Sequence, residues 1–452
     1  MPNASQTSPW RIPTRWAGGL ALTALSLLTW HQDVMALPAF ARQTGQSCVA
    51  CHAGGQFPEL TPYGRMFKLT GYTLGEHANP LSVMAAASVS RLANPDGINA
   101  SLNANASGAA LQLPLLNNTL KLDQVSVFLA GKITDNIGAF TQISHDPYAN
   151  PNASGEYRLG HSGVDNVDLR FADHFLSPQG DFLWGVSVNN NPSVSDPWNT
   201  AWAWSQYVPS SGGPGANTYL DAHAPYPNSA LPGDHYAGIN VYMYIHQSVY
   251  AEWGMYRSPA GRLHFLNTGY EPTNSILKSS NNPYWRFAYT KEWGAHNLML
   301  GTMGVLAHPF DSNFGVSTSD AQSYQLVRSQ GLDAQYQYLL DPHALTIQWS
   351  NQQQRLSPSA ADALSNGTPL SATGIMRAKA SYVFNARYGL SASTFSQSGD
   401  FSSNTQGNTL ELFFMPIQNL RLGLQLTTYN RLANIDKPSD ANTVNFYAWS
   451  AF

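Results

Sequence analysis

The sequence predicts an all-β fold, an antiparallel barrel of sixteen strands, from three observations. From about residue 81 onwards, apolar and polar residues alternate with a period of two, which is typical of strands with one apolar face. The connections between these segments are alternately long and short. Charged residues make up only 11% of the 452 residues, whereas soluble globular proteins contain about 25%.

Sixteen segments carry the alternation, and residues 420–427 (LRLGLQLT) show it without interruption. The predicted strands are residues 83–91, 121–133, 137–145, 164–172, 181–189, 238–246, 249–257, 284–291, 297–307, 331–340, 344–353, 374–383, 388–398, 407–415, 420–430 and 442–452. An even number of strands, with short turns at one end and long loops at the other, is typical of barrels in the bacterial outer membrane. A soluble sandwich or propeller would also bury apolar faces, but would not by itself produce the alternating loop lengths.

Other membrane and nucleic-acid functions are excluded by composition. No stretch reaches the roughly 18 apolar residues of a membrane-spanning helix, so a helical transporter is excluded. A net charge of −4 provides no basic surface for nucleic acid.

The aromatic residue Phe452 at the end of the sequence is a usual signal for delivery to the outer membrane.

The first 36 residues predict a secretory signal peptide. Arg11 and Arg15 precede a largely apolar run over residues 17–30, and the small-residue pattern Val34-Met35-Ala36 follows, so we expect cleavage after Ala36. A short membrane anchor is the alternative, but it needs about 20 apolar residues. The mature chain is therefore expected outside the cytoplasm.

Both cysteines of the chain fall in one pentapeptide, Cys48-Val49-Ala50-Cys51-His52. In a CxxCH motif the two thiols form thioethers with a haem and the histidine binds its iron, so the motif predicts one covalently attached haem c. The competing interpretations are a redox-active CxxC, half of a zinc site or an ordinary disulfide. Zinc would need two further ligands, and a thioredoxin-like CxxC would need a βαβ context; the sequence provides neither nearby.

Residues 37–80 therefore predict a small N-terminal α-helical monohaem cytochrome c domain, followed by a porin-like barrel over 81–452. Apolar side chains that would cover the haem, or simply pack a small core, are Phe40, Phe57, Leu60, Tyr63, Phe67, Leu69 and Tyr72. Basic side chains that would pair with the haem propionates are Arg42, Arg65 and Lys68.

The sixth iron ligand is left open by the sequence. Met84 is the first candidate because it follows His52 by 32 residues, enough for the chain to return across the haem. Met66 and His77 are the other candidates, and an open site is a further alternative. A thioether ligand would raise the reduction potential above that of a bis-histidine haem.

The linker of residues 74–80 is too short for the haem domain to move far from the first strand. We therefore expect the domain to lie in or against the periplasmic mouth of the barrel and to plug its lumen, where a single haem can carry electrons across an insulating membrane. Polar residues expected in the lumen, and able to hold the plug, are Arg377, Lys379, Glu411 and Arg421.

Several segments resemble a known family. Residues 37–52 (LPAFARQTGQSCVACH) and 57–72 (FPELTPYGRMFKLTGY) resemble the fused monohaem cytochrome-porins of iron-oxidising bacteria, and residues 80–84, 189–192 and 196–200 are similar to that family as well. The resemblance is dense over 37–84 and patchy afterwards. The residues between the haem motif and Phe57, and those after Asn199, depart from the family's pattern.

The resemblance implies an outer-membrane cytochrome c that oxidises extracellular Fe(II) and passes the electron through its haem to a periplasmic cytochrome c or copper protein. It implies Cys48 and Cys51 as the attachment sites and His52 as the axial ligand, and it identifies no catalytic residue for iron oxidation. It also leaves room for a homo-oligomer, since porins often form trimers.

Carboxylates in the predicted outer loops, which would hold Fe(II) weakly or simply be solvated, are Asp146, Glu156, Asp196 and Asp311. Two alternative functions stay open at this point. One is an electron conduit for a different extracellular donor or acceptor, and the other is a diffusion porin with an accessory haem.

Overall fold

The computed structural model describes most of the chain after the predicted signal peptide, which lies outside it. The described residues are 38–55, 59–98, 117–146, 161–177, 180–190, 192–198, 237–259, 266, 277–278, 282–310, 324–360, 370–399, 404–432 and 435–452.

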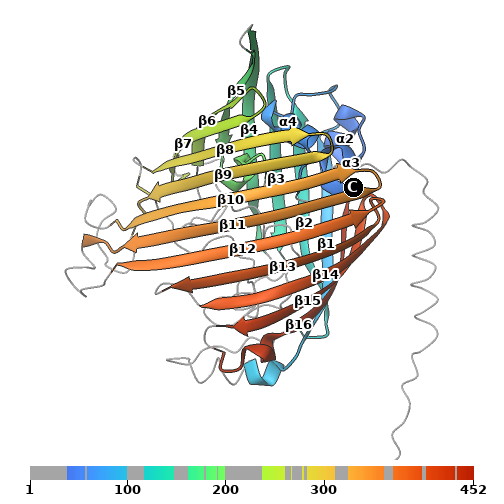
Figure 1. The fold of residues 1–452 in the computed structure, drawn as a ribbon, viewed down its shortest axis with the longest axis vertical. Helices are drawn as coiled ribbons and strands as arrows, with labels where there is room; N and C mark the ends of the chain where they lie inside the picture. The colour runs from blue at the N-terminus through green and yellow to red at the C-terminus, as the bar shows by residue number, and fades with distance from the viewer. Residues whose placement is uncertain are drawn as a thin grey trace, which may run out of the picture. The chain divides into compact units, whose positions relative to one another are not determined.

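Sixteen antiparallel strands form one closed barrel in which each strand pairs with its neighbours in the sequence (Figure 1). Their bounds are β1 Leu81–Leu92, β2 Leu120–Lys132, β3 Ile137–Asp146, β4 His161–Ser177, β5 Gly180–Asn189, β6 Ala237–Ile245, β7 Val249–Arg257, β8 Pro283–Trp293, β9 His296–Ala307, β10 Leu326–Leu340, β11 His343–Ser357, β12 Ser371–Phe384, β13 Tyr388–Gly399, β14 Thr405–Ile417, β15 Leu420–Arg431 and β16 Thr443–Ala451. All sixteen predicted strands are confirmed, and β4 and β10 extend furthest beyond the predicted limits.

Closure is made by β1 and β16, which pair in register from Met84 opposite Ala451 to Leu92 opposite Thr443. A closed sheet has no edge, so its backbone donors and acceptors are paired within the protein. The predicted alternation of connections is also confirmed, with tight turns after each even strand and longer connections after each odd strand.

The two faces of the sheet differ in chemistry, as β14 illustrates. Leu410, Leu412 and Phe414 point outwards and are 47%, 53% and 38% exposed, whereas Thr409 and Glu411, which alternate with them, are buried on the inward face. Aromatic residues are exposed near the short turns; they include Tyr289, Trp293, Phe384 and Tyr388. An apolar band with an aromatic girdle is the outer surface of a bacterial outer-membrane barrel, and the outer membrane is the location of this protein.

Short helices precede, interrupt and follow the strands. Before β1 lie α2 (Pro38–Thr44), α3 (Cys48–Cys51), η1 (Ala53–Gly55) and α4 (Pro62–Leu69); α6 (Pro192–Ser195) follows β5, and η6 (Pro438–Ala441) precedes β16. Among the residues that the structure describes, no helix is long and apolar enough to cross a membrane.

The limits of α4 follow from its sequence. Thr61 caps its N-terminus by accepting a hydrogen bond from the Gly64 amide (3.1 Å), and Pro62 occupies the first turn, where its missing N–H is not needed. The helix ends before Gly71, which has a φ of 72° that glycine adopts without strain.

The outward position of Leu412 predicts that the cost of a charged side chain depends on its depth in the membrane. Leu412→Lys places an ammonium group in the apolar band and is expected to lower the free energy of unfolding by about 2–4 kcal/mol. Gln406→Lys, on the same face and nearer the long-loop end of β14, is the matched control and is expected to cost at most about 1 kcal/mol. Denaturant titration in lipid vesicles measures both, and equal costs would contradict the proposed membrane position.

Candidate functional site

A largely apolar cavity lies between the N-terminal helices and the inward face of the barrel. Its volume is about 1030 Å³, counted together with the space at its mouth. Residues on its wall come from α2 to α4, from β1, β2, β3 and β16, and from α6; they include Phe40, Cys48, Cys51, His52, Leu60, Phe67, Lys68, Tyr72, Met84, Phe128, Phe140, Val194, Trp449 and Ala451. A predominantly apolar wall with a few polar groups is typical of sites for small molecules and cofactors.

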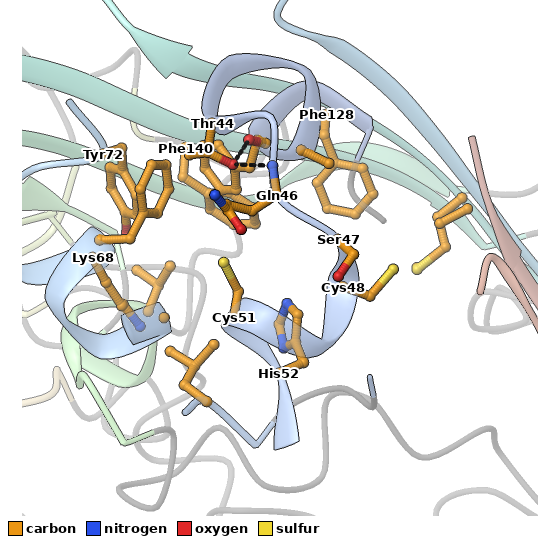
Figure 2. A pocket seen from close by; sticks show the side chains of 18 of the residues that line it. Thr44, Gln46, Ser47, Cys48, Cys51, His52, Lys68, Tyr72, Phe128 and Phe140 are labelled. Atoms are coloured by element: carbon orange, nitrogen blue, oxygen red, sulfur yellow. Dashed lines mark hydrogen bonds between the residues drawn. The ribbon is translucent and has the colours of Figure 1, made fainter. Parts of the chain in front are cut away.

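The three residues of the CxxCH motif reach this cavity together. Cys48 and Cys51 are the first and last residues of the single turn α3, so they share one face of it. His52 is the C-terminal cap, and its amide donates to the Cys48 carbonyl (2.8 Å). Figure 2 shows both thiols and the imidazole on one side of the space, with the rings of Tyr72, Phe128 and Phe140 across from them. No disulfide joins the two cysteines.

Burial sets the protonation of these groups. It lowers the pKa of the His52 imidazole to about 4, so the ring is neutral near pH 7, which is the form that binds metals. Burial, and secondarily the neighbouring Cys48, raises the pKa of the Cys51 thiol to about 11. A redox-active CxxC needs a lowered thiol pKa, so this environment does not favour a thioredoxin-like role.

Aromatic rings form much of the remaining wall. Phe40 of α2 stacks on Tyr72 (5.4 Å between centroids) and meets Phe67 of α4 edge to face (4.8 Å). Phe128 of β2 and Phe140 of β3 lie 5.7 Å apart on the barrel side. Side chains from the helices and from the sheet therefore enclose one apolar space.

The structure separates the predicted covering residues into two groups. Phe40, Leu60, Phe67 and Tyr72 line the cavity, as expected. Leu69 is buried instead in a second cluster with Trp198 and Tyr242, and Tyr63 is 40% exposed. Phe57 lies outside the described residues.

The candidate sixth ligands also occupy different environments. Met84 of β1 is buried on the cavity wall with Cys48, Cys51 and His52. Met66 of α4 packs against the cluster that contains Leu69. His77, in the linker before β1, is exposed.

Lys68 is the one predicted propionate partner on the cavity wall. Its ammonium donates to the Asp196 carbonyl (2.7 Å), and burial, followed by the charge of Arg170, lowers its pKa to about 8. Arg42 donates to the carbonyls of Asn79 and Leu81.

Arg65 instead fastens α4 to the inside of the barrel. Its guanidinium donates to Gln337 of β10 (2.9 Å) and Asn297 of β9 (3.1 Å) and lies 3.4 Å from Glu292 of β8. The expectation that Arg65 pairs with a propionate is therefore not supported by its position. These contacts of the Arg65 guanidinium join α4 to β8, β9 and β10.

A second connection involves one of the four residues expected to hold the N-terminal segment. Lys379 of β12 forms an ion pair with Glu59 (2.6 Å), as expected. Glu411 and Arg421 pair with each other within the barrel wall (2.8 Å), and Tyr447 donates to Glu411. Arg377 is a buried inward residue of β12.

Gly54 brings the segment close to the sheet. A Cβ at Gly54 would lie 2.6 Å from the Cβ of Val383 on β12, and the φ of Gly54 is 64°. Both the close approach and the backbone conformation require glycine at this position.

Residues 192–198 were expected to lie in an outer loop, but Pro192 and residues 194–198 are buried. Val194 lines the cavity wall, and the Ser195 carbonyl accepts a hydrogen bond from Arg170 (2.6 Å). Asp196 is fully buried and paired with Arg286 (3.3 Å), so its prediction as an exposed carboxylate for Fe(II) is wrong.

Asp333 of β10 completes this charged cluster by accepting two hydrogen bonds from Arg286, at 2.6 and 2.7 Å. Sequence reasoning missed these residues, although Arg286 and Asp333 fall at inward positions of their strands, where a charge needs a partner. Glu156, Asp311 and the side chain of Asp146 lie outside the described part of the structure. Within that part, no group of three or more His, Cys, Asp or Glu side chains is arranged to hold a metal ion.

The chain matches no protein-family model and no curated protein. Among solved structures it is similar to OmpF of Salmonella typhi in complex with daunomycin (10% identity, 82% of this chain and 97% of that chain covered, TM-score 0.45). It is also similar to the outer-membrane channel DcaP of Acinetobacter baumannii (8%, 82% and 96%, TM-score 0.46) and to a loop-deletion mutant of OmpT of Vibrio cholerae (10%, 82% and 98%, TM-score 0.42). These likenesses concern the fold.

The lowered pKa of Lys68 gives a stability prediction with a definite sign. Between about pH 8 and the ordinary lysine value of 10.5 the unfolded chain binds more protons than the folded one, so the free energy of unfolding rises with pH in this window. The rise is at most about 3.5 kcal/mol, since each pKa unit corresponds to about 1.4 kcal/mol. Lys68→Met is expected to remove it.

Denaturant titrations at a series of pH values measure this effect. Lys291→Met, which removes an exposed lysine of β8, is the control and is expected to keep the rise. An unchanged pH profile in Lys68→Met would show that the buried ammonium is not its source.

Proposed function

We propose that this protein is an outer-membrane c-type cytochrome-porin that oxidises extracellular Fe(II) and passes the electron to a periplasmic cytochrome c or copper protein. One observation carries the proposal. The three residues of the CxxCH motif open together into an apolar cavity whose opposite wall is the inside of a closed membrane barrel. A redox group held there lies within the protein that spans the membrane.

The residues present fit a haem c. Cys48 and Cys51 would carry the thioether bonds, and His52, neutral because of its burial, would be the axial ligand. The aromatic wall suits a porphyrin face, Lys68 supplies one cation for a propionate, and Met84 supplies a thioether on the same wall. When bound, the haem supplies a one-electron carrier whose iron alternates between the ferric and ferrous states.

The connections between the N-terminal segment and the barrel support a plug in the lumen. Arg65 and Glu59 bond to inward residues of β8 to β10 and of β12, and Val194, from the connection after β5, closes part of the cavity. Connections after odd strands are the extracellular ones in outer-membrane barrels. The cavity wall therefore combines side chains from the periplasmic side with one from an extracellular connection.

The first experiment mixes the full-length oxidised protein in detergent with Fe(II) in a stopped-flow spectrometer, from acidic to neutral pH. Rapid appearance of ferrous haem bands is the expected result. The double variant Cys48→Ser/Cys51→Ser is expected to lack covalent haem, whereas Ser47→Ala, a neighbouring cavity residue with both thiols kept, is the matched control.

Three other results would each overturn a stated part of the proposal. Absence of covalent haem in the native protein would remove the cytochrome. Reduction by dithionite but not by Fe(II) would keep the conduit and assign it another donor. Large ion conductance in a planar bilayer would favour a diffusion porin, because a plugged conduit passes little current.

The position of Met84 predicts the sixth ligand. Met84→Ala is expected to lower the reduction potential of the haem, because loss of a thioether ligand removes its preference for the ferrous state. Met66→Ala, which alters a packed methionine of α4 outside the cavity wall, is expected to leave the potential unchanged. Spectroelectrochemical titration of both variants measures the difference, and the reverse pattern would assign the ligand to Met66.

A further inference from the structure

β10 and β11 lie side by side in the barrel (Figure 1). Their register is known along the full length of the pair, so their outward residues can be compared row by row. From the short-turn end, the first outward row is Leu340 opposite His343. The next rows, Tyr338 opposite Leu345, Tyr336 opposite Ile347 and Ala334 opposite Trp349, belong to the apolar band. Leu332, in the following row, is 56% exposed and stands opposite Asn351.

The outward side chains then change from apolar to polar and charged within two rows. Gln330 stands opposite Gln353, and Arg328 stands opposite Arg355; all four side chains are exposed. From Tyr338 to Arg328 the strand advances about 34 Å at about 3.4 Å per residue. At a strand tilt of about 40° this corresponds to about 26 Å of height, close to that of an apolar band about 25 Å tall. The two arginines lie four residues beyond Leu332 on the long-loop side, at the level of lipid headgroups.

Two like charges directly opposite each other on neighbouring strands are unfavourable. The flanking outward residues on the adjacent strands are Leu306 of β9 and Ala372 of β12, which carry no charge. On the same face of the strands, the next residues are Leu326, Gln330, Gln353 and Ser357. The two guanidinium groups thus share a surface with amides and apolar side chains.

Among the described strands, two arginines stand opposite each other at this end only on β10 and β11. The other exposed arginines at this end stand singly: Arg91 of β1 is opposite Val444, Arg257 of β7 is opposite Ala237, and Arg431 of β15 is opposite Gln406. A general need for charge at the membrane surface is therefore met elsewhere by one arginine in a row. The paired arginines on β10 and β11 require a separate reason.

We propose that Arg328 and Arg355, with Gln330 and Gln353 below them, bind a phosphate group of an anionic glycolipid in the outer leaflet of the membrane. Guanidinium groups bind phosphate oxygens through paired hydrogen bonds, and the side-chain amides of the glutamines supply further donors. Leu332 and Trp349 extend the same surface into the apolar band, where acyl chains lie. This site is independent of the haem and of the proposed electron transfer.

The test titrates the purified full-length protein in detergent with bis-phosphorylated lipid A and measures binding by native mass spectrometry. The double variant Arg328→Gln/Arg355→Gln is expected to bind about tenfold or more weakly, because it removes both guanidinium groups that pair with the phosphate. Arg257→Gln, which removes a single exposed arginine from the end of β7, is the matched control and is expected to bind as the native protein does. Arg328→Lys/Arg355→Lys keeps the charge and is expected to give intermediate affinity.

Retention of a heat-modifiable, folded band on electrophoresis establishes that each variant forms its barrel. Equal binding by the native protein and the glutamine variant would overturn the proposal, as would equal affinity for lipid A from which the phosphates have been removed. Complete competition by millimolar inorganic phosphate would show that the site binds a free anion and not the lipid. A change of oligomeric state in the glutamine variant, with lipid binding unchanged, would assign the surface to a contact between copies.

Discussion

Hydrogen bonds between β1 and β16 close the sheet, and both the membrane fold and the cavity depend on them. Inside a bilayer each unpaired backbone group is costly, so an open sheet would not be stable there. The same two strands contribute Met84, Trp449 and Ala451 to the cavity wall. The seam that satisfies the backbone is therefore also the surface that faces the CxxCH motif.

The inward face of the barrel carries charged side chains that form ion pairs with the N-terminal segment and with residues 192–198. Arg286 and Asp333 are fully buried, which would be costly without mutual bonds at 2.6 and 2.7 Å. The buried carboxylate of Asp168 likewise accepts hydrogen bonds from Tyr72 (2.6 Å) and Ser187 (2.7 Å). Polar groups that would line an open channel serve here as internal attachments.

Features set by neighbouring residues were predictable from the sequence, and features set by distant residues were not. A period of two identified all sixteen strands, and the spacing within CxxCH placed two thiols and an imidazole on one turn. The role of Arg65 was missed because its partners Gln337 and Asn297 lie on strands more than two hundred residues later, and nothing local specifies which inward positions meet α4. Asp196 was misjudged for the same reason, since its environment depends on Arg286.

The composition of the cavity wall has a consequence for biogenesis. Cys48 and Trp449 lie on one wall but are separated by 401 residues of chain, and Cys48 is only 3% exposed in the finished protein. Under the proposed function, an enzyme that forms a thioether bond at Cys48 would need access that this burial denies. Attachment of the proposed haem would therefore precede the pairing of β1 with β16.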